Sequence, residues 1–369
     1  MGAATEMLRQ WSACVKGELL AGLNGHQRKA LAALSLGVAL AGHCHSGRVA
    51  PLVPGPAGPA SARRRWERLL ANPRLRVRSG EVLASGALAR AVLSRWSGRE
   101  LVLTLDETPG PGRLRCLRVS AAYRGRALPL AWACYREGEL PAPMPRLAWR
   151  LLRRVARCLP PGASVTLLAD RGLSWPSVLD CCVALGWHYV LRVQGATRVR
   201  YRDRLGRTRE ARARSLAPQR GARWSAPARA FKKAGWRGAH VSAVWAEGCR
   251  APWLLVADRP GLRRHVRGYC KRAWCEQTHR DDKSSAFNWQ ASRVADPARA
   301  CRLLLVLALA TLLAASLGAR AVKRGLRRAL EARRRRSLSL VQLGLRCLRR
   351  ALAGDRPPPL PLCPLSLPP

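Results

Sequence analysis

The sequence predicts an α/β protein in which a mixed sheet is flanked by helices, and two observations lead to this fold class. Between residues 101 and 195, short apolar runs typical of buried strands alternate with helical segments in the order β-β-β-α-β-α-β. Residues 1–100 instead have helical patterns, and residues 196–262 are rich in Arg, Gly and Ala before they end in a hairpin pattern. A chain of 369 residues is long enough for about two domains. We therefore expect an N-terminal helical module, a sheet, and a β-rich insertion within the sheet.

The N-terminal module contains at least two helices separated by a loop. Residues 26–41 open polar and continue as a core-like helix, and the Pro/Gly/Ala-rich stretch 51–62 cannot continue a helix. A new helix then starts with Ser61 as its expected N-cap and carries three consecutive arginines at 63–65. Such a cluster suits phosphate contacts, but it is equally compatible with a solvated helix face.

The middle of the chain contains the strands. Residues 101–108 (LVLTLDET) and 164–172 (SVTLLADRG) are apolar runs that each end in an acid, as expected of strands buried on both faces. Two further strands follow the first and are joined by a tight turn at Gly125. The remaining predicted elements are an amphipathic helix over 144–159, a helix over 174–187 with Ser174 at its cap and Pro176 in its first turn, and a strand over 188–195.

The C-terminal part is predicted to be helical up to a Pro-rich tail. One long helix begins near His265 and a second near Pro297. The run 303–317 is strongly apolar but shorter than the ~20 residues that span a bilayer, so we expect a buried core helix and no membrane partner. The tail after residue 355 has the composition of an extended or disordered segment.

The charge of the chain points to a polyanionic partner. Lys and Arg number 67 against 21 Asp and Glu, a formal net charge of +46. Nucleic acid is the first partner to expect and anionic membrane the second, although an Arg-rich coding bias could account for part of the excess. The thirteen cysteines are scattered without a CxxC pair, and the first twenty residues lack a long apolar core. We therefore expect reduced thiols, no secretory signal and a cytoplasmic location.

Asp106 and Asp170 occupy equivalent positions, because each follows an apolar strand and precedes a polar turn. Ligands of open α/β sheets bind at the carboxyl ends of the strands, where neighbouring strands would bring these two carboxylates together. Such a pair needs a cation, and Mg²⁺ or Mn²⁺ prefers carboxylate oxygen. The alternative is that each Asp only caps the turn that follows it.

The predicted helix from His265 offers further candidates on one face. The spacings of three, four, four and three place five side chains within an arc of roughly 80°. These are Tyr269, Arg272, Glu276, Arg280 and Lys283. Glu276 could complete a metal site while the cations reach phosphates on either side of it. A solvated helix with an ion pair between Arg272 and Glu276 would explain the same pattern, but it leaves the two aspartates unexplained.

These motifs resemble those of the insertion-sequence DDE transposases, and in particular the insertion sequence type four group. Its signature Tyr-x2-Arg-x3-Glu-x6-Lys is matched at every spacing by Tyr269, Arg272, Glu276 and Lys283. The segments LTLDET and LLADRG resemble the strands that carry the first and second Asp of that family. The resemblance runs from about residue 63 to residue 350.

The resemblance implies a fold, a reaction and roles for the site residues. It implies a ribonuclease-H-like core in two parts, 98–195 and 263–350, around an insertion domain over 196–262. An N-terminal DNA-binding domain over 1–97 and the tail over 351–369 complete the expected organisation. The reaction would be cut-and-paste transposition, in which terminal inverted repeats and target double-stranded DNA are cleaved and joined with two Mg²⁺ or Mn²⁺ ions inside a synapsed homodimer. The residues with implied roles are Asp106, Asp170 and Glu276 as metal ligands and Tyr269, Arg272 and Lys283 as DNA contacts, with Arg280 added from helix geometry.

Alternatives remain open from the sequence. A catalytically inactive DNA-binding protein derived from such an element would have the same charge, and a membrane-associated basic protein rests only on the run 303–317. His279 lies between Glu276 and Lys283, but a metal-activated water needs no general base. Trp253 in the hairpin either stacks on a flipped base or packs in the hairpin core, and core packing is the stronger expectation.

Overall fold

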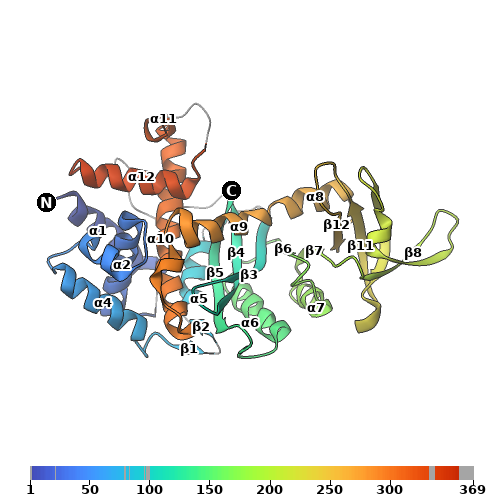
Figure 1. Cartoon of the computed structure of the whole chain (residues 1–369), viewed down its shortest axis with the longest axis horizontal. Coiled ribbons are helices and arrows are strands. Elements are labelled where there is room, and N and C mark those ends of the chain that lie inside the picture. The colour runs from blue at the N-terminus through green and yellow to red at the C-terminus, as the bar shows by residue number, and fades with distance from the viewer. Residues whose placement is uncertain are drawn as a thin grey trace.

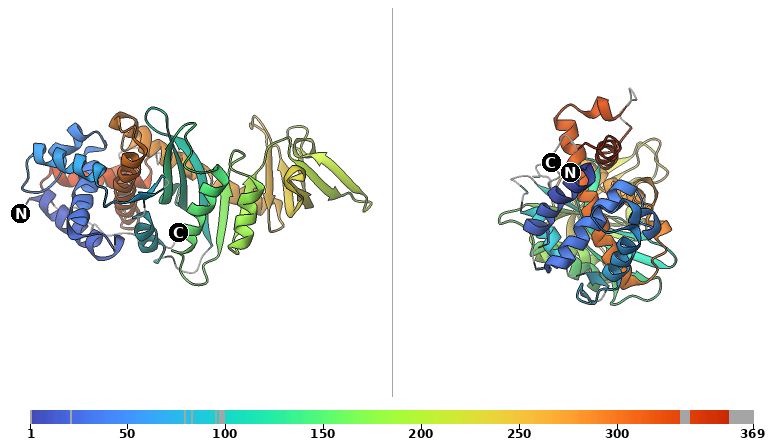
Figure 2. Two further views of the ribbon diagram at one scale, coloured as in Figure 1. Left: turned by 90° about the horizontal axis from the view of Figure 1, so that it is seen from below. Right: turned by 90° about the vertical axis from the view of Figure 1, so that its left-hand side faces the viewer.

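The computed structural model describes residues 2–20, 22–78, 80–82, 84–94, 96, 100–331 and 337–356. The expectation for the Pro-rich tail therefore lies almost wholly outside the described residues. The molecule is elongated, with the N-terminal helices at one end, the sheet in the middle and the strands of the 196–262 segment at the other end (Figure 1). Figure 2 shows that the strands lie side by side, one after another along this long axis, and form one continuous sheet.

One twelve-stranded sheet connects the middle of the chain to the predicted insertion. Its order is β1-β2-β5-β4-β3-β6-β7-β12-β11-β10-β8-β9. The pairs β3–β6 and β6–β7 are parallel and the other neighbours are antiparallel, so the sheet is mixed as predicted. The strands are β1 (Val77–Arg78), β2 (Glu81–Val82), β3 (Leu101–Pro109), β4 (Leu114–Tyr123), β5 (Arg126–Arg136), β6 (Val165–Ala169), β7 (His188–Arg192), β8 (Arg198–Arg202), β9 (Thr208–Arg212), β10 (Arg223–Ala230), β11 (Arg237–Val244) and β12 (Trp253–Ala257).

Helices pack around this sheet and form the N-terminal end of the molecule (Figure 1). The α-helices are α1 (Ala3–Cys14), α2 (Gly25–Ala41), α3 (Ser46–Val49), α4 (Pro59–Ala71), α5 (Ser85–Leu93), α6 (Met144–Ala156), α7 (Pro176–Ala184), α8 (Leu262–Cys270), α9 (Ala273–Arg280), α10 (Pro297–Lys323), α11 (Arg327–Leu330) and α12 (Leu340–Ala353). Short 3₁₀ turns lie at Ala50–Leu52, Ala213–Leu216, Lys232–Ala234 and Trp289–Ser292, and π-helical turns at Val15–Leu19 and Asp281–Ser285.

The register of β3 and β6 positions the candidate acids. Leu105 lies opposite Ala169 in the parallel pair, so the next residues along the two strands, Asp106 and Asp170, are neighbours. The prediction that Asp106 ends its strand is wrong. Strand β3 continues to Pro109 because β4, its antiparallel partner on the other side, still pairs with these residues.

Helix ends follow local capping chemistry, with two corrections to the expected caps. Helix α4 begins at Pro59 with Gly58 as its N-cap rather than at Ser61, because proline at the first helical position is already preset for the helix. For the same reason the N-cap of α7 is Trp175, directly before Pro176, and not Ser174. The loop expected over 51–62 is shorter at both ends, because residues 51–52 belong to the 3₁₀ turn Ala50–Leu52 and residues 59–62 belong to α4.

The segment after β7 extends the sheet. Strands β11 and β12 pair antiparallel, which confirms the predicted hairpin, and β12 pairs with β7 of the central sheet. The Arg-rich stretch before the hairpin adds β8, β9 and β10 at the far edge. Trp253 of β12 packs edge to face on Tyr269, with ring centroids 5.1 Å apart, so its side chain joins the hairpin to the segment Leu262–Cys270 (α8) instead of packing in the core of the hairpin alone.

Helix α10 is the central helix of the core. It has 27 residues and a mean hydropathy of 2.2 over its most apolar stretch, so by length and composition it could cross a membrane. That stretch is entirely buried here, against α2, α12 and β5, as expected of a core helix. Arg302, in the second turn of α10, is buried and donates to the carbonyl oxygen of Leu70 at the end of α4 and to that of Leu75 in the segment that follows.

Helices α10 and α12 cross at two glycines. A Cβ added at Gly318 would lie 1.9 Å from the carbonyl oxygen of Leu340, and one added at Gly344 would lie 1.9 Å from that of Ala314. The two backbones are therefore in direct contact, and any side chain at either position would force the helices apart.

We expect Gly344→Ala to lower the free energy of unfolding by about 1–3 kcal/mol, the usual cost of overpacking, despite the better helix propensity of alanine. Denaturant unfolding of the full chain measures this difference. The control is Gly25→Ala in the first turn of α2, where an added Cβ has no neighbour within 4 Å. Unchanged stability of Gly344→Ala would show that the two helices do not cross this closely.

Candidate active site

The two aspartates lie side by side at the sheet but in different environments. Asp106 is buried within β3, while the side chain of Asp170 is one-third exposed directly after β6. One carboxylate oxygen of Asp170, Oδ1, accepts from the backbone N–H of Gly172 at 2.9 Å. The capping role considered for this residue is therefore real. This capping hydrogen bond uses only Oδ1, so the second oxygen of Asp170, Oδ2, can face the site.

The helix that carries Glu276 is not the single regular helix predicted from the sequence. It tightens between α8 and α9, where Lys271, Arg272, Trp274 and Cys275 donate to carbonyls three residues back, and it widens to a π-helical turn after Arg280. Both changes alter the angle between successive side chains, so the regular turn of about 100° per residue, which the expectation of one face assumed, does not hold along the whole segment.

The four residues of the signature and the added Arg280 differ in exposure. Tyr269 is 4% exposed and packs on Trp253, whereas Arg280 is exposed. The side chain of Glu276 is 56% exposed and that of Arg272 only 14%. Lys283 is half-buried, and burial together with the charge of Arg118 lowers its pKa, against the opposing effect of Asp282 and Asp106.

All three predicted metal ligands contact the guanidinium of Arg272. Its Nη2 lies 2.7 Å from Asp106 Oδ1 and 3.4 Å from Asp170 Oδ2, and its Nη1 donates to Glu276 Oε1. The structure thus gathers three acids that are far apart in sequence around one cation. The ion pair between Arg272 and Glu276, considered as an alternative for an exposed helix, is one part of this cluster.

The charges of this cluster keep Asp106 ionised. Burial raises the pKa of Asp106, but the His279 imidazole and the Arg272 guanidinium together hold it below its usual value. Burial also lowers the pKa of Arg272, but the neighbouring acids, Asp106 foremost, raise it above the usual value. An ionised carboxylate beside a permanent cation is a site where a metal cation or a phosphate could exchange for one of the partners.

Two side chains of α9 on the other side of Asp106 complete its surroundings. Cys275 Sγ and His279 Nε2 each lie 3.2 Å from Asp106 Oδ2, and both residues are buried. From the sequence, His279 was a candidate only as a general base, and Cys275 was not predicted at all. The signal was present, because positions four apart on a helix share a face and both flank Glu276.

The π-helical turn after α9 is anchored by two buried ion pairs. Asp281 Oδ2 lies 2.5 Å from Arg126 Nε, and Asp282 Oδ2 lies 2.6 Å from Arg118 Nη1. Thr278 Oγ1 also accepts from the backbone N–H of Ala127 at 2.8 Å. These contacts join the Glu276 helix to β4 and β5, and none of them was predicted from the sequence.

Loss of one partner should strongly destabilise the fold. We expect Asp282→Asn to lower the free energy of unfolding by about 3–5 kcal/mol, because it leaves the charge of Arg118 buried and uncompensated. The control Glu139→Gln removes one partner of an exposed pair, with a side chain that is 63% exposed, and should change stability by no more than about 0.5 kcal/mol. Equal effects of the two substitutions in denaturant unfolding would contradict the anchoring role.

Comparison with known proteins finds a similarity to one family over part of the chain. Residues 144–313 match the family model described as the transposase DDE domain. The matched segment contains Asp170 and Glu276 and begins after the strand of Asp106. No curated protein matches the chain. The match supports a DDE transposase, and the mixed sheet with its flanking helices is consistent with the ribonuclease-H-like fold of such enzymes.

Proposed function

We propose that the protein is a DNA transposase of the insertion sequence type four group, which cleaves and joins DNA at terminal inverted repeats. The observation that carries this proposal is the convergence of Asp106, Asp170 and Glu276 on the single guanidinium of Arg272. Three carboxylates around one position in a protein of net charge +46 suit phosphodiester chemistry on a polyanion.

The donor set fits divalent cations. The three acids carry more negative charge than Arg272 neutralises, and carboxylate oxygens are the ligands that Mg²⁺ and Mn²⁺ prefer. Two such ions, when bound, would stabilise charge on the attacking and the leaving oxygen of the phosphodiester. Asp106, Asp170 and Glu276 would hold them. Arg272, no longer paired with the acids, would bind a DNA phosphate together with Lys283 and Arg280. Tyr269 would contact DNA only if its side chain left its packing against Trp253.

A basic cavity beside the site supports DNA binding at the inserted strands. It has a volume of about 790 Å³, and the described residues that line it include six arginines and no acid. The arginines are Arg171, Arg192, Arg198, Arg212, Arg214 and Arg250. Arg171 directly follows Asp170 in the chain, so a DNA backbone bound in this cavity would lead to the carboxylates.

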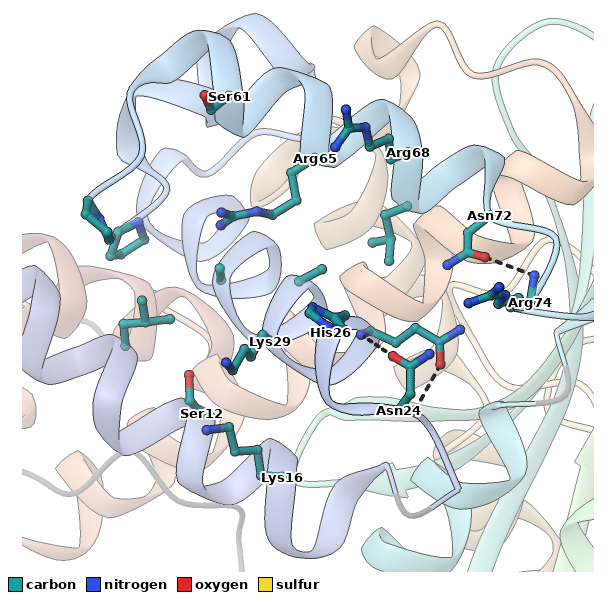
Figure 3. A pocket seen from close by; sticks show the side chains of 18 residues that line it. Ser12, Lys16, Asn24, His26, Lys29, Ser61, Arg65, Arg68, Asn72 and Arg74 are labelled. Carbon is teal, nitrogen blue, oxygen red and sulfur yellow. Dashed lines mark hydrogen bonds between the residues drawn. The ribbon is translucent and has the colours of Figure 1, made fainter.

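A second basic cavity lies among the N-terminal helices and supports their role in terminal-repeat binding. It has a volume of about 870 Å³, and the described residues that line it include no acid. In Figure 3, Lys16, Lys29 and Arg65 line the same space from the turn after α1, from α2 and from α4. His26, Arg68 and Arg74 add to its positive charge. Phosphate contacts of this kind position DNA without reading its sequence.

The catalytic part of the proposal is tested by strand transfer on DNA that carries the inverted repeats flanking the gene, with Mg²⁺ or Mn²⁺. We expect Asp106→Asn to lower the rate of strand transfer by about 1,000-fold or more, because it removes a proposed metal ligand. Each ten-fold loss in rate corresponds to only about 1.4 kcal/mol of lost transition-state stabilisation. The control is Asp180→Asn, which removes a carboxylate that pairs with Arg237 on the exposed surface. Equal rates for wild type and Asp106→Asn would remove Asp106 from the chemistry.

The binding part is tested by the salt dependence of DNA affinity. We expect Arg65→Ala and Arg68→Ala each to weaken binding to all sequences and to reduce the slope of log affinity against log salt by about 0.9. Arg64→Ala is the comparison, because this arginine is exposed on the same helix but does not line the cavity. Identical slopes for all three variants would assign the binding to another surface.

The second candidate function is a DNA-binding protein without nuclease activity. The observation that favours it is the net charge of +46, because binding to DNA through positive charge requires no cluster of carboxylates. Salt-dependent DNA binding without cleavage under Mg²⁺ or Mn²⁺ would support this function instead.

The transposase proposal also includes an assembly and a location. Cleavage would take place in a synapsed homodimer in the cytoplasm, on DNA of the nucleoid.

A further inference from the structure

We propose that Asp106, Cys275 and His279 form a binding site for a thiophilic divalent transition ion, with Zn²⁺ as the best match. Among the described residues, these three form a group whose ligand atoms all lie within 4.8 Å of one another. The site is separate in chemistry from the proposed Mg²⁺ site, because it replaces two carboxylates with a thiol and an imidazole.

Two of the three distances between the ligand atoms are close to those of tetrahedral coordination, and all three are within 4.8 Å. Asp106 Oδ2 lies 3.2 Å from Cys275 Sγ and 3.2 Å from His279 Nε2. Zinc bonds of about 2.0 Å to oxygen and nitrogen and about 2.3 Å to sulfur, at tetrahedral angles, require ligand atoms roughly 3.3–3.7 Å apart. A small adjustment of the side chains would therefore admit the ion.

The imidazole of His279 is available as a ligand. Its side chain is 8% exposed, and neither ring nitrogen makes a hydrogen bond of acceptable geometry within the described residues, although Nε2 points at Asp106. A buried imidazole whose one polar contact is the poorly aligned one to Asp106 is costly, and an ion bound through Nε2 would satisfy it better. Cys275 and His279 come from successive turns of α9, so the helix presents both to Asp106.

The donor chemistry selects the ion. Thiolate and imidazole suit Zn²⁺, whereas Mg²⁺ prefers oxygen. The single S–H of Cys275 is shared between two acceptors, Asp106 Oδ2 and the carbonyl oxygen of Arg272. Metal binding would release this proton to solvent and form the Sγ–metal bond. The resulting thiolate and the Asp106 carboxylate would balance the two positive charges of the ion, while Arg272 keeps its contact with the other oxygen, Oδ1.

Binding of Zn²⁺ at this site would have a regulatory consequence, which rests on the proposed function. Asp106 is shared with the proposed catalytic cluster, so an ion held by Cys275 and His279 would reorient the carboxylate that catalysis needs. Zn²⁺ would then inhibit strand transfer in the presence of excess Mg²⁺.

Titration of the reduced, metal-free full-length protein with Co²⁺ tests the site without any activity assay. We expect a sulfur-to-cobalt charge-transfer band in the near ultraviolet, together with visible bands of tetrahedral Co²⁺, and loss of both on addition of Zn²⁺. Cys275→Ser should abolish the charge-transfer band, and His279→Gln should weaken Co²⁺ affinity at least 10-fold. The matched control is Cys270→Ser, which removes an exposed thiol five residues upstream and should leave the spectrum unchanged.

The outcomes separate the two proposals. Absence of the charge-transfer band in the wild-type protein, or its persistence in Cys275→Ser, overturns the zinc site whatever the protein does to DNA. If Cys275→Ser fails to fold, as judged by its thermal unfolding, the wild-type spectrum and His279→Gln decide. A wild-type spectrum that depends on Cys275 and His279 supports the zinc site even if no strand transfer is found.

Discussion

The position of the candidate active site depends on the two buried ion pairs that join the π-helical turn after α9 to the antiparallel strands. Asp281 and Asp282 are both buried, and each would be costly there without its arginine partner on β5 or β4. Because both arginines are fixed in strands of the sheet, the turn can satisfy its two carboxylates in one position only. That position places Glu276, one turn or more earlier in the helix, next to the neighbouring strands β3 and β6.

The same electrostatic reasoning explains the role of Arg272. Three carboxylates that converge would repel one another, and the guanidinium lowers this cost by contacting all of them. Arg272 reaches this position because the helix tightens just before α9. In the proposed reaction the same guanidinium has two alternative sets of partners, the acids or a DNA phosphate, so the binding of metal ions and the binding of DNA at this site would be linked.

Local patterns predicted the strands and several helices well, because each depends on neighbouring residues. The apolar runs before Asp106 and Asp170 became β3 and β6, and the segments joined at Gly125 became the β4–β5 hairpin. The helix from His265 was predicted less well. The single-face argument assumed 3.6 residues per turn, whereas the packed helix tightens near Arg272 and widens after Arg280 to suit contacts with the sheet.

The amino-acid sequence was enough to find the two acids of the apolar strand segments, the spacing of Tyr269, Arg272, Glu276 and Lys283, and the burial of the most apolar helix. These features follow from residue order, periodicity and hydrophobicity, so they do not depend on how the helices and strands pack against one another. Packing in three dimensions was needed to show that Cys275 and His279 face Asp106, that Arg118 and Arg126 pair with buried aspartates, and that Gly318 and Gly344 lie where two helix backbones meet. Each of these contacts joins residues distant in sequence, and no local pattern says which of the many arginines, acids or glycines will meet when the surfaces pack.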